Sequence, residues 1–257
     1  MSVRDQPWPE GTPSFAELTA PDLDAAEAFY GPLLGWTFDR APASMNHYTT
    51  ALLNGRVAAA LNPPIPGSGD TAGWLTHLST GDATAAAARA SAAGAQIVVA
   101  PMPVMEFGAL AVIIDPLGAV VALWQANRTI GAQVVNEPGA MIWNEHMSAN
   151  LPAAQDFYRA LFGYHYDDMS APGFEYATFD TGDRELGGMG GGSEIARWVV
   201  TFAVADTDAA VARALELGGA VHHQPEDTPY GRIAGIAGPF GERFYLMSTD
   251  EPNTPEA

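Results

Sequence analysis

Lysine and cysteine are both absent from this chain of 257 residues, so all 11 of its basic side chains are arginines. Without lysine there is no residue for a Schiff base and none for the lysine of a phosphate-binding loop. Without cysteine, thiol catalysis, disulfides and thiolate metal ligands are excluded. These two absences remove much of the mechanistic repertoire of enzymes.

Basic residues are also few beside acidic ones, and the formal net charge at pH 7 is -19. A surface this negative repels phosphate backbones and anionic lipid heads, so we expect no nucleic-acid partner and no membrane partner. Residues 1–11 carry charges and prolines instead of the apolar core of a signal peptide. No run approaches the roughly 20 apolar residues of a spanning helix. We therefore expect a soluble, cytoplasmic protein.

A repeat divides the chain in two. Residues 15–30, FAELTAPDLDAAEAFY, are echoed by residues 143–158, WNEHMSANLPAAQDFY. Further anchors recur in the same order, among them Gly35 with Gly163, Tyr48 with Tyr176, Arg56 with Arg184 and Trp74 with Trp198. Chance seldom keeps so many anchors in order. The sequence predicts two homologous domains, residues 1–126 and 139–257, joined by a polar, Gly- and Pro-containing linker at residues 127–138.

The helix and strand signals within each half also predict two similar units, each made of a strand, a helix and further strands. In the first unit, Asp22 is a plausible helix N-cap and Gly35 a plausible helix stop. Asn54-Gly55 is a strong hairpin signal between two apolar segments. The pattern restarts with a strand at residues 74–79 and an Ala-rich helix at residues 82–93. The predicted class is therefore α+β.

Two segments carry a resemblance to a known family. DLDAAEAFYGPLLGW from residue 22 and DPLGAVVALW from residue 115 resemble the vicinal oxygen chelate superfamily of glyoxalases, bleomycin-resistance proteins and extradiol dioxygenases. Residues 131–139 resemble the joining segment of tandem glyoxalase-like proteins of actinobacteria. The resemblance implies two tandem glyoxalase-like domains, each built from two βαβββ modules that form a half-open barrel with the ligand on its concave face.

The resemblance also implies where metal-dependent members place their ligands. In this sequence those positions hold Glu17, His77 and Ala122 in the first half and Glu145, Thr201 and Tyr245 in the second. A catalytic divalent ion normally needs at least three protein ligands from histidines and carboxylates, and neither set supplies them. We therefore predict no metal and no other cofactor. A carboxylate from elsewhere, with Glu106 nearest by sequence, is the remaining route to a metal site.

Glu17 and His77 are the predicted catalytic pair. If they lie on facing strands in one cavity, a carboxylate beside an imidazole can move protons, with titration near neutral pH within reach. The alternative is a hydrogen-bonded polar pair without a catalytic role, in a pocket that has lost its function. Glu145 repeats Glu17 without a histidine, which favours a structural or ligand-binding role. His146 follows it directly and should point to the opposite face, at an interface or the surface.

Aromatic side chains suggest the ligand. Trp124 shares a strand face with Ala122, and Tyr245 takes the matching position in the second half. Large rings on a face that has lost a metal ligand favour a flat, apolar ligand. The predicted ligand-binding residues are therefore Trp124, Tyr245, Ala122, Glu145 and Thr201. The glycine-rich segment 187–192 lacks the spacing of a phosphate-binding motif and is predicted to be a flexible connection.

Three functions remain open. The first is a metal-independent enzyme of the lyase or isomerase type that isomerises, eliminates or cyclises a hydrophobic, oxygenated small molecule in secondary metabolism. The second is a resistance protein that binds and sequesters an aromatic natural product without changing it. The third, a metal-dependent glyoxalase or dioxygenase, is disfavoured by Ala122 and Tyr245. In each case the partner is a hydrophobic or aromatic small molecule, and the chain is a monomer or a homodimer.

Overall fold

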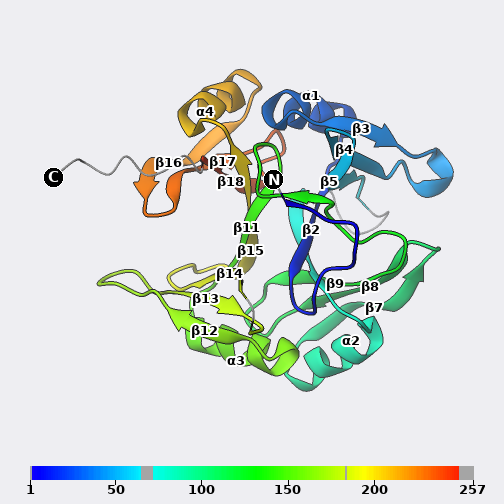
Figure 1. Cartoon of the computed structure of the whole chain (residues 1–257), viewed down its shortest axis with the longest axis vertical. Coiled ribbons are helices and arrows are strands. Elements are labelled where there is room, and N and C mark those ends of the chain that lie inside the picture. Colours follow the sequence, from blue (N-terminus) through cyan, green and yellow to red (C-terminus); the bar gives the residue numbers. More distant parts are fainter. Residues whose placement is uncertain (1, 65–71, 183, 249–257) are drawn as a thin grey trace.

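A computed structural model describes residues 2–64, 72–182 and 184–248 (Figure 1). Two mixed sheets form the frame of the protein, one from each half of the chain. Neither sheet is closed, and each carries two helices. The predicted α+β architecture of two tandem domains, each built from two βαβββ modules, is confirmed.

The N-terminal domain contains an eight-stranded sheet in the order β3-β4-β5-β2-β6-β9-β8-β7. Its first module comprises β2 (Pro13–Thr19), α1 (Leu23–Leu34), β3 (Thr37–Arg40), the short 3-10 helix η1 (Ala43–Met45), β4 (Thr49–Leu53) and β5 (Arg56–Asn62). Its second module comprises β6 (Gly73–Ser79), α2 (Ala83–Ala92), β7 (Gln96–Val104), β8 (Gly108–Ile114) and β9 (Val120–Ala126). The first strands of the two modules, β2 and β6, are neighbours at the centre of the sheet.

The C-terminal domain repeats this order as β12-β13-β14-β11-β15-β18-β17-β16. Its first module comprises β11 (Met141–Met147), α3 (Leu151–Phe162), β12 (His165–Asp168), β13 (Tyr176–Asp180) and β14 (Glu185–Gly190). Its second module comprises β15 (Arg197–Val204), α4 (Thr207–Glu216), β16 (Ala220–Thr228), β17 (Gly231–Ala237) and β18 (Arg243–Ser248). Two short strands, β1 (Ser2–Val3) and β10 (Val134–Val135), extend this sheet to ten strands.

Local signals in the sequence fix the first module as expected. The Asp22 carboxylate caps α1 by accepting hydrogen bonds from the backbone N–H groups of Asp24 and Ala25, and Gly35 ends the helix in the left-handed region at φ 73°. Asn54 and Gly55 both have positive φ, and the strands that they join, β4 and β5, pair antiparallel. The predicted cap, stop and hairpin are therefore confirmed.

Most of the glycine-rich segment differs from the prediction. Residues 187–190 lie inside strand β14, which pairs with both β11 and β13, and only Gly191 and Gly192 belong to the connection between the modules. A Cβ atom added at Gly188 would overlap the hydroxyl of Tyr176, and one added at Gly187 would lie 2.5 Å from the carbonyl oxygen of Asn144. The glycines are there because neighbouring groups occupy the space of a side chain.

The predicted linker also contains structure of its own. Within residues 127–138, β10 pairs antiparallel with β1 and parallel with β11. The backbone N–H of Ala132 donates to the carbonyl of Ser14 over 2.8 Å, and Trp8 donates its indole N–H to the carbonyl of Ala132 over 3.0 Å. The segment therefore packs tightly against both domains.

The hydrophobic core is shared between the domains. Helix α1 lies beside α4 at one end of the molecule and α2 beside α3 at the other (Figure 1). Each of the two apolar clusters contains residues from both halves of the chain. At the centre the two sheets meet back to back, where Thr76 of β6 donates to the side-chain oxygen of Asn144 of β11 over 2.8 Å. The faces that carry the family's ligand positions turn away from this core.

Polar contacts across the domain boundary are also repeated. Tyr158 of α3 donates to Asp115 over 3.0 Å, and its counterpart Tyr30 of α1 donates to Glu242 over 2.6 Å. His146, which was expected at an interface or the surface, is fully buried at this interface with its Nε2 atom 2.8 Å from Asp115. The two domains are thus held together by buried hydrogen bonds as well as by apolar packing.

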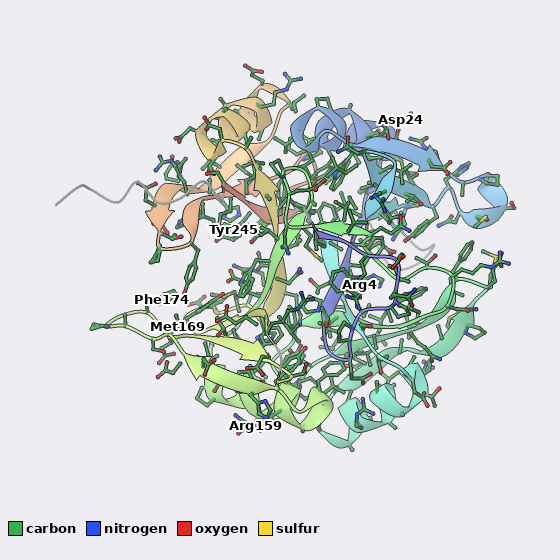
Figure 2. All side chains as sticks on the ribbon, viewed as in Figure 1. Arg4, Asp24, Arg159, Met169, Phe174 and Tyr245 are labelled. Atoms are coloured by element: carbon green, nitrogen blue, oxygen red, sulfur yellow. The ribbon has the colours of Figure 1, made fainter. Side chains whose placement is uncertain are left out.

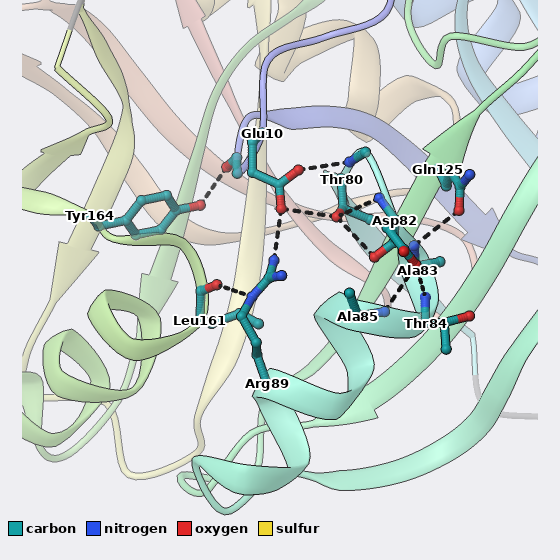
Figure 3. A network of polar contacts seen from close by, with 12 residues as sticks. Glu10, Thr80, Asp82, Ala83, Thr84, Ala85, Arg89, Gln125, Leu161 and Tyr164 are labelled. Atoms are coloured by element: carbon teal, nitrogen blue, oxygen red, sulfur yellow. Dashed lines mark hydrogen bonds and ion pairs between the residues drawn. The ribbon is translucent and has the colours of Figure 1, made fainter.

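Further contacts lie at the edge of the boundary. Arg89 of α2 donates to the Glu10 carboxylate over 2.8 Å and to the carbonyl of Leu161 over 3.0 Å, and the Tyr164 hydroxyl donates to the carbonyl of Gly11 (Figure 3). These bonds tie the segment before β2 to the C-terminal domain. Among the helices of the described residues, none is both long and apolar enough to cross a membrane.

Candidate functional site

The register of the central strands places the predicted residues of the N-terminal domain together. In the antiparallel pair of β2 and β6, Phe15 lies opposite His77 and Glu17 lies opposite Leu75, so all four side chains share one face. In the parallel pair of β6 and β9, His77 lies beside Ala122. Trp124 follows two residues later on the same face. Glu17, His77, Ala122 and Trp124 therefore form one group, the N-terminal site.

Glu17 and His77 approach each other but do not form a direct hydrogen bond. The distance from Nε2 of His77 to Oε2 of Glu17 is 4.0 Å. Both oxygens of Glu17 are already used, because Oε2 accepts a hydrogen bond from the Tyr48 hydroxyl over 2.8 Å and Oε1 accepts one from the side-chain amide of Asn62. Nε2 of His77 is buried and has no hydrogen-bond partner among the described residues.

Burial sets the protonation states of this site. His77 is only 4% exposed, and burial lowers its pKa to about 4. Titration nearer neutral pH had been expected from the adjacent carboxylate, but burial is the dominant effect. Burial also raises the pKa of Glu17, and the hydrogen bonds from Tyr48 and Asn62 oppose that rise. At neutral pH the site therefore presents a neutral imidazole beside a carboxyl group held by two donors.

Aromatic rings flank the imidazole on both sides. The ring centroid of Phe15 lies 5.7 Å from that of His77, and the centroid of Trp124 lies 6.3 Å from it. The Trp124 indole donates its N–H to the carbonyl of Thr129 over 2.9 Å, which fixes the ring. Gly108 leaves space for it, since a Cβ atom at that position would lie 2.5 Å from the indole. The imidazole is thus enclosed by rigid apolar surface.

The C-terminal domain keeps half of this arrangement. The Tyr176 hydroxyl donates to Oε2 of Glu145 over 2.8 Å and accepts the indole N–H of Trp143 over 2.9 Å. Thr201 lies beside Tyr245 in the parallel pair of β15 and β18, as His77 lies beside Ala122 in the other half. Burial raises the pKa of Glu145, while Tyr176 and Arg197 oppose the rise. Glu145, Tyr176, Thr201 and Tyr245 form the C-terminal site.

The rim of the C-terminal site is aromatic. Phe174 stacks on Tyr176 with centroids 5.4 Å apart and remains 53% exposed. Figure 2 shows Phe174 and Met169 on the same side of the C-terminal domain as Tyr245. His222 and His223 both contact the Tyr245 ring, at centroid distances of 5.4 and 5.9 Å.

Strand alternation alone would place these two histidines on opposite faces of the sheet. The pairing of β16 with β17 is irregular at His223, and a bulge of this kind breaks strand alternation. Gly235 on the neighbouring strand provides the room, because a Cβ atom there would meet the His222 ring. Burial is the main reason that the pKa of His222 is lowered, and Arg243 and Arg197 add to the effect.

The residues at the family's metal positions do not fit a resident divalent ion. In the N-terminal site the third position is the methyl group of Ala122, and both Glu17 oxygens already accept hydrogen bonds. Glu106 lies on the β7–β8 turn, where it is exposed and its carboxylate lies 3.4 Å from Arg128. Across the described residues, no three His, Asp or Glu side chains are grouped closely enough to bind a metal.

Tyr48, Asn62, Tyr176 and Trp143 contribute to the two sites, although the sequence analysis assigned them no function. One signal was available for two of them. Tyr48 and Tyr176 are separated along the chain by the same interval as Glu17 and Glu145, so each tyrosine could have been matched to the glutamate of its own half. The other two show no recurring pattern, because Asn62 and Trp143 correspond to Gly190 and Phe15.

Comparison with known proteins identifies the family. The model of the Glyoxalase/Bleomycin resistance protein/Dioxygenase superfamily matches residues 13–123 and 147–246. The chain therefore belongs to this superfamily and contains two copies of its domain.

Two relatives and two solved structures extend this result. The chain is 37% identical over 249 residues to the Mycobacterium tuberculosis protein named "Putative glyoxylase CFP32", covering 93% of this chain and 95% of that protein. It is 35% identical over 259 residues to "Anthracycline biosynthesis protein DnrV" of Streptomyces peucetius, covering 94% of each.

The fold is similar to that of a Mn(II)-bound glyoxalase from Novosphingobium aromaticivorans, with a TM-score of 0.68, 15% identity and coverage of 95% of this chain and 84% of that chain. The 2,3-dioxygenase LapB from Pseudomonas sp. KL28 gives a TM-score of 0.67, 14% identity and coverage of 96% of each chain.

Proposed function

We propose that the N-terminal site binds a hydrophobic, oxygen-bearing small molecule and moves a proton on it, as in an isomerisation, elimination or cyclisation, without a metal ion. The observation that carries this proposal is the buried, unpartnered Nε2 atom of His77, 4.0 Å from the Glu17 carboxylate. A buried polar atom normally has a partner, and an imidazole nitrogen without one among the described residues is suited to a substrate.

The proposed step is the transfer of a proton from a carbon whose carbanion is stabilised by a carbonyl group, either directly or through an aromatic ring. Neutral His77 takes the proton at Nε2, and the electron pair of the C–H bond moves into the enolate of the substrate. Glu17, held by Tyr48 and Asn62, lies close enough to stabilise the imidazolium that forms. Because burial disfavours that cation, His77 returns the proton readily to another atom of the substrate. His77 therefore acts as a relay, and proton balance is kept within the substrate.

The proposed substrate class is a planar aromatic compound. The rings of Phe15 and Trp124 on either side of His77 suit a flat molecule, which gains buried area and stacking there. A relative whose printed name is anthracycline biosynthesis protein supports the same choice. We therefore propose a role in secondary metabolism, as an enzyme that acts on an oxygenated aromatic intermediate.

A second candidate is binding without turnover. It is favoured by the C-terminal site, where the glutamate and tyrosine persist but Thr201 replaces the histidine. A pair of sites that only hold aromatic ligands would need no proton relay. The two candidates differ in what the loss of His77 should change.

The experiment uses 1,8-dihydroxyanthrone, a planar aromatic ketone whose C10 protons exchange through its enol. Binding is followed by quenching of tryptophan fluorescence, and turnover by deuterium incorporation at C10 in anaerobic D₂O. We expect His77→Gln to bind the probe but to lose catalysed exchange by roughly 100-fold or more, because a general base contributes 10²–10⁴-fold. Thr201→Val is the matched control in the C-terminal site and should retain exchange. Exchange that is unchanged in His77→Gln would refute the catalytic proposal, and binding with no acceleration in the wild type would favour the second candidate.

A further inference from the structure

A cavity of about 500 Å³ lies at the boundary between the domains and shares Trp143 with the C-terminal site. It is bounded by the N-terminal segment, the linker and the edge of strands β11 and β14. The side chains that give it chemical character are Arg4, Trp8, Thr12, Trp143, Asn144 and Arg184. Figure 2 shows Arg4 on the N-terminal segment near the middle of the molecule. A volume of this size is typical of sites for small organic ligands.

The cavity exists because the linker covers the first module's strands in the N-terminal domain but leaves the equivalent strands of the C-terminal domain partly uncovered. In the N-terminal domain, the linker covers the edge of β2 and β5 with hydrogen bonds from Ala132 to Ser14 over 2.8 Å and from Gln133 to Val57 over 2.7 Å. In the C-terminal domain, β10 pairs with β11 only at Met141, and β14 pairs with β11 only from Glu145 onward. The stretch between these two pairings borders the cavity.

Two cations converge on this cavity in a chain of net charge -19. Arg4 is fixed in place, since it donates to the carbonyls of Gln6 and Pro7 and lies 4.8 Å above the Trp8 ring. Arg184 forms no ion pair with any other described residue. Arginine side chains at the edge of a cavity favour a carboxylate or phosphate group. One acidic residue, Glu185, also borders the cavity, but its carboxylate accepts a hydrogen bond from Thr178 over 3.2 Å.

A second observation points to a ligand. Thr12 borders the cavity and is only 4% exposed, and its hydroxyl has no hydrogen-bond partner among the described residues. A buried hydroxyl of this kind gains from a ligand that accepts or donates a hydrogen bond. The indoles of Trp8 and Trp143 add flat apolar surface to the same cavity. The combination of two arginines, a buried hydroxyl and two indoles suits an aromatic ring that carries an anionic group.

We propose that this cavity binds a small aromatic carboxylate. The carboxylate interacts with Arg4, Arg184 and the Thr12 hydroxyl, and the ring packs against the indoles. Trp143 also donates its N–H to Tyr176, and Tyr176 donates to Glu145, so a ligand here contacts one end of the hydrogen-bonded chain of the C-terminal site. The cavity is thereby a ligand site that does not involve His77.

The test is a calorimetric titration of the full chain with benzoate at low ionic strength. We expect saturable binding at one site per chain, with benzamide and acetate binding at least roughly tenfold more weakly because each lacks the charge or the ring. Arg184→Gln and Thr12→Val should weaken benzoate binding by a similar factor. Arg56→Gln is the matched control, because Arg56 is the counterpart of Arg184 in the half whose edge is covered by the linker. It should bind benzoate like the wild type.

Several outcomes would overturn this proposal. One is that benzoate shows no saturable binding. Another is that Arg184→Gln and Arg4→Gln bind benzoate as tightly as the wild type does. A third is that Arg56→Gln loses as much benzoate affinity as Arg184→Gln. Loss of benzoate binding in His77→Gln would assign the ligand to the N-terminal site instead. Failure of the anthrone experiment has no bearing on these outcomes, because that experiment probes a different site.

Discussion

Tyr48 donates its hydroxyl hydrogen to the carboxylate of Glu17 over 2.8 Å. Tyr176 and Glu145 repeat this hydrogen bond at the same distance in the C-terminal domain. The carboxylate–phenol pair is therefore common to both halves, whereas the buried imidazole of His77 has Thr201 as its counterpart. Duplication kept a polar group on each central strand, and the N-terminal domain combines the carboxylate–phenol pair with the imidazole of His77, which burial keeps neutral at neutral pH.

The first prediction concerns these two tyrosines. Tyr48→Phe removes one of the two hydrogen bonds that hold the Glu17 carboxylate. A hydrogen bond to a charged group contributes about 1.5–3 kcal/mol, so we expect a loss of roughly tenfold or more in catalysed anthrone exchange. Tyr176→Phe is the matched control and should leave exchange unchanged. An equal effect of both variants would show that the tyrosines matter for folding and not for the N-terminal site.

The second prediction concerns the pH dependence of stability. Burial lowers the pKa of folded His77 from 6.5 to about 4, so between these pH values the unfolded chain binds a proton that the folded chain does not. The free energy of unfolding should therefore fall as the pH falls through this window. At about 1.4 kcal/mol per pKa unit, the contribution of His77 is about 3 kcal/mol.

Urea unfolding at several pH values measures this contribution. The raised pKa of Glu17 acts in the opposite sense, so the informative quantity is the difference between the wild type and His77→Gln. His77→Gln should lose less stability than the wild type on acidification. His165→Gln, at a histidine with 72% of its side chain exposed, should behave like the wild type. If the wild type and His77→Gln lose the same free energy of unfolding on acidification, this pH dependence does not come from His77.

The third prediction concerns the two carboxylates at the domain boundary. Burial by itself raises the pKa of Asp115, but hydrogen bonds from His146, Ala119 and Tyr158 outweigh it and hold the pKa below its ordinary value. Burial raises the pKa of Glu242, and its hydrogen bonds do not reverse the rise. Asp115→Asn should therefore destabilise the protein by about 2–4 kcal/mol, and Glu242→Gln by about 1 kcal/mol or less. Chemical denaturation checks the order, which would be wrong if Glu242→Gln cost more.

The fourth prediction concerns Gly188. A Cβ atom at this position would overlap the Tyr176 hydroxyl, so Gly188→Ala must displace the tyrosine from Glu145. Overpacking of this kind costs about 1–3 kcal/mol. Gly73→Ala is the control, because a Cβ atom at Gly73 of β6 meets nothing within 4 Å. Thermal unfolding should separate the two variants, and equal melting temperatures would show that Tyr176 adapts without loss.

Much of the fold could be predicted because its signals are local or repeated. Asp22 and Gly35 bound a helix through contacts within a few residues, and Asn54-Gly55 sets a hairpin by its backbone preferences alone. The proximity of Glu17 and His77 was implied by the resemblance to the superfamily, whose ligand positions these two residues occupy. These inferences needed no knowledge of how the two domains meet.

The remaining features depend on contacts between distant segments. The bond from Tyr48 to Glu17 requires β4, β5 and β2 to be neighbours in that order. The bulge that turns both His222 and His223 toward Tyr245 has no sequence signal apart from Gly235 on the adjacent strand. The glycines of β14 looked like a flexible connection because the groups that fill their side-chain space come from other strands.

The most direct test of the proposed chemistry is deuterium exchange into 1,8-dihydroxyanthrone catalysed by protein that has been stripped of metal with a chelator. The account predicts that the stripped wild type accelerates exchange as well as untreated protein does, and that His77→Gln does not. Loss of exchange on stripping, with recovery on addition of Mn²⁺, would contradict it.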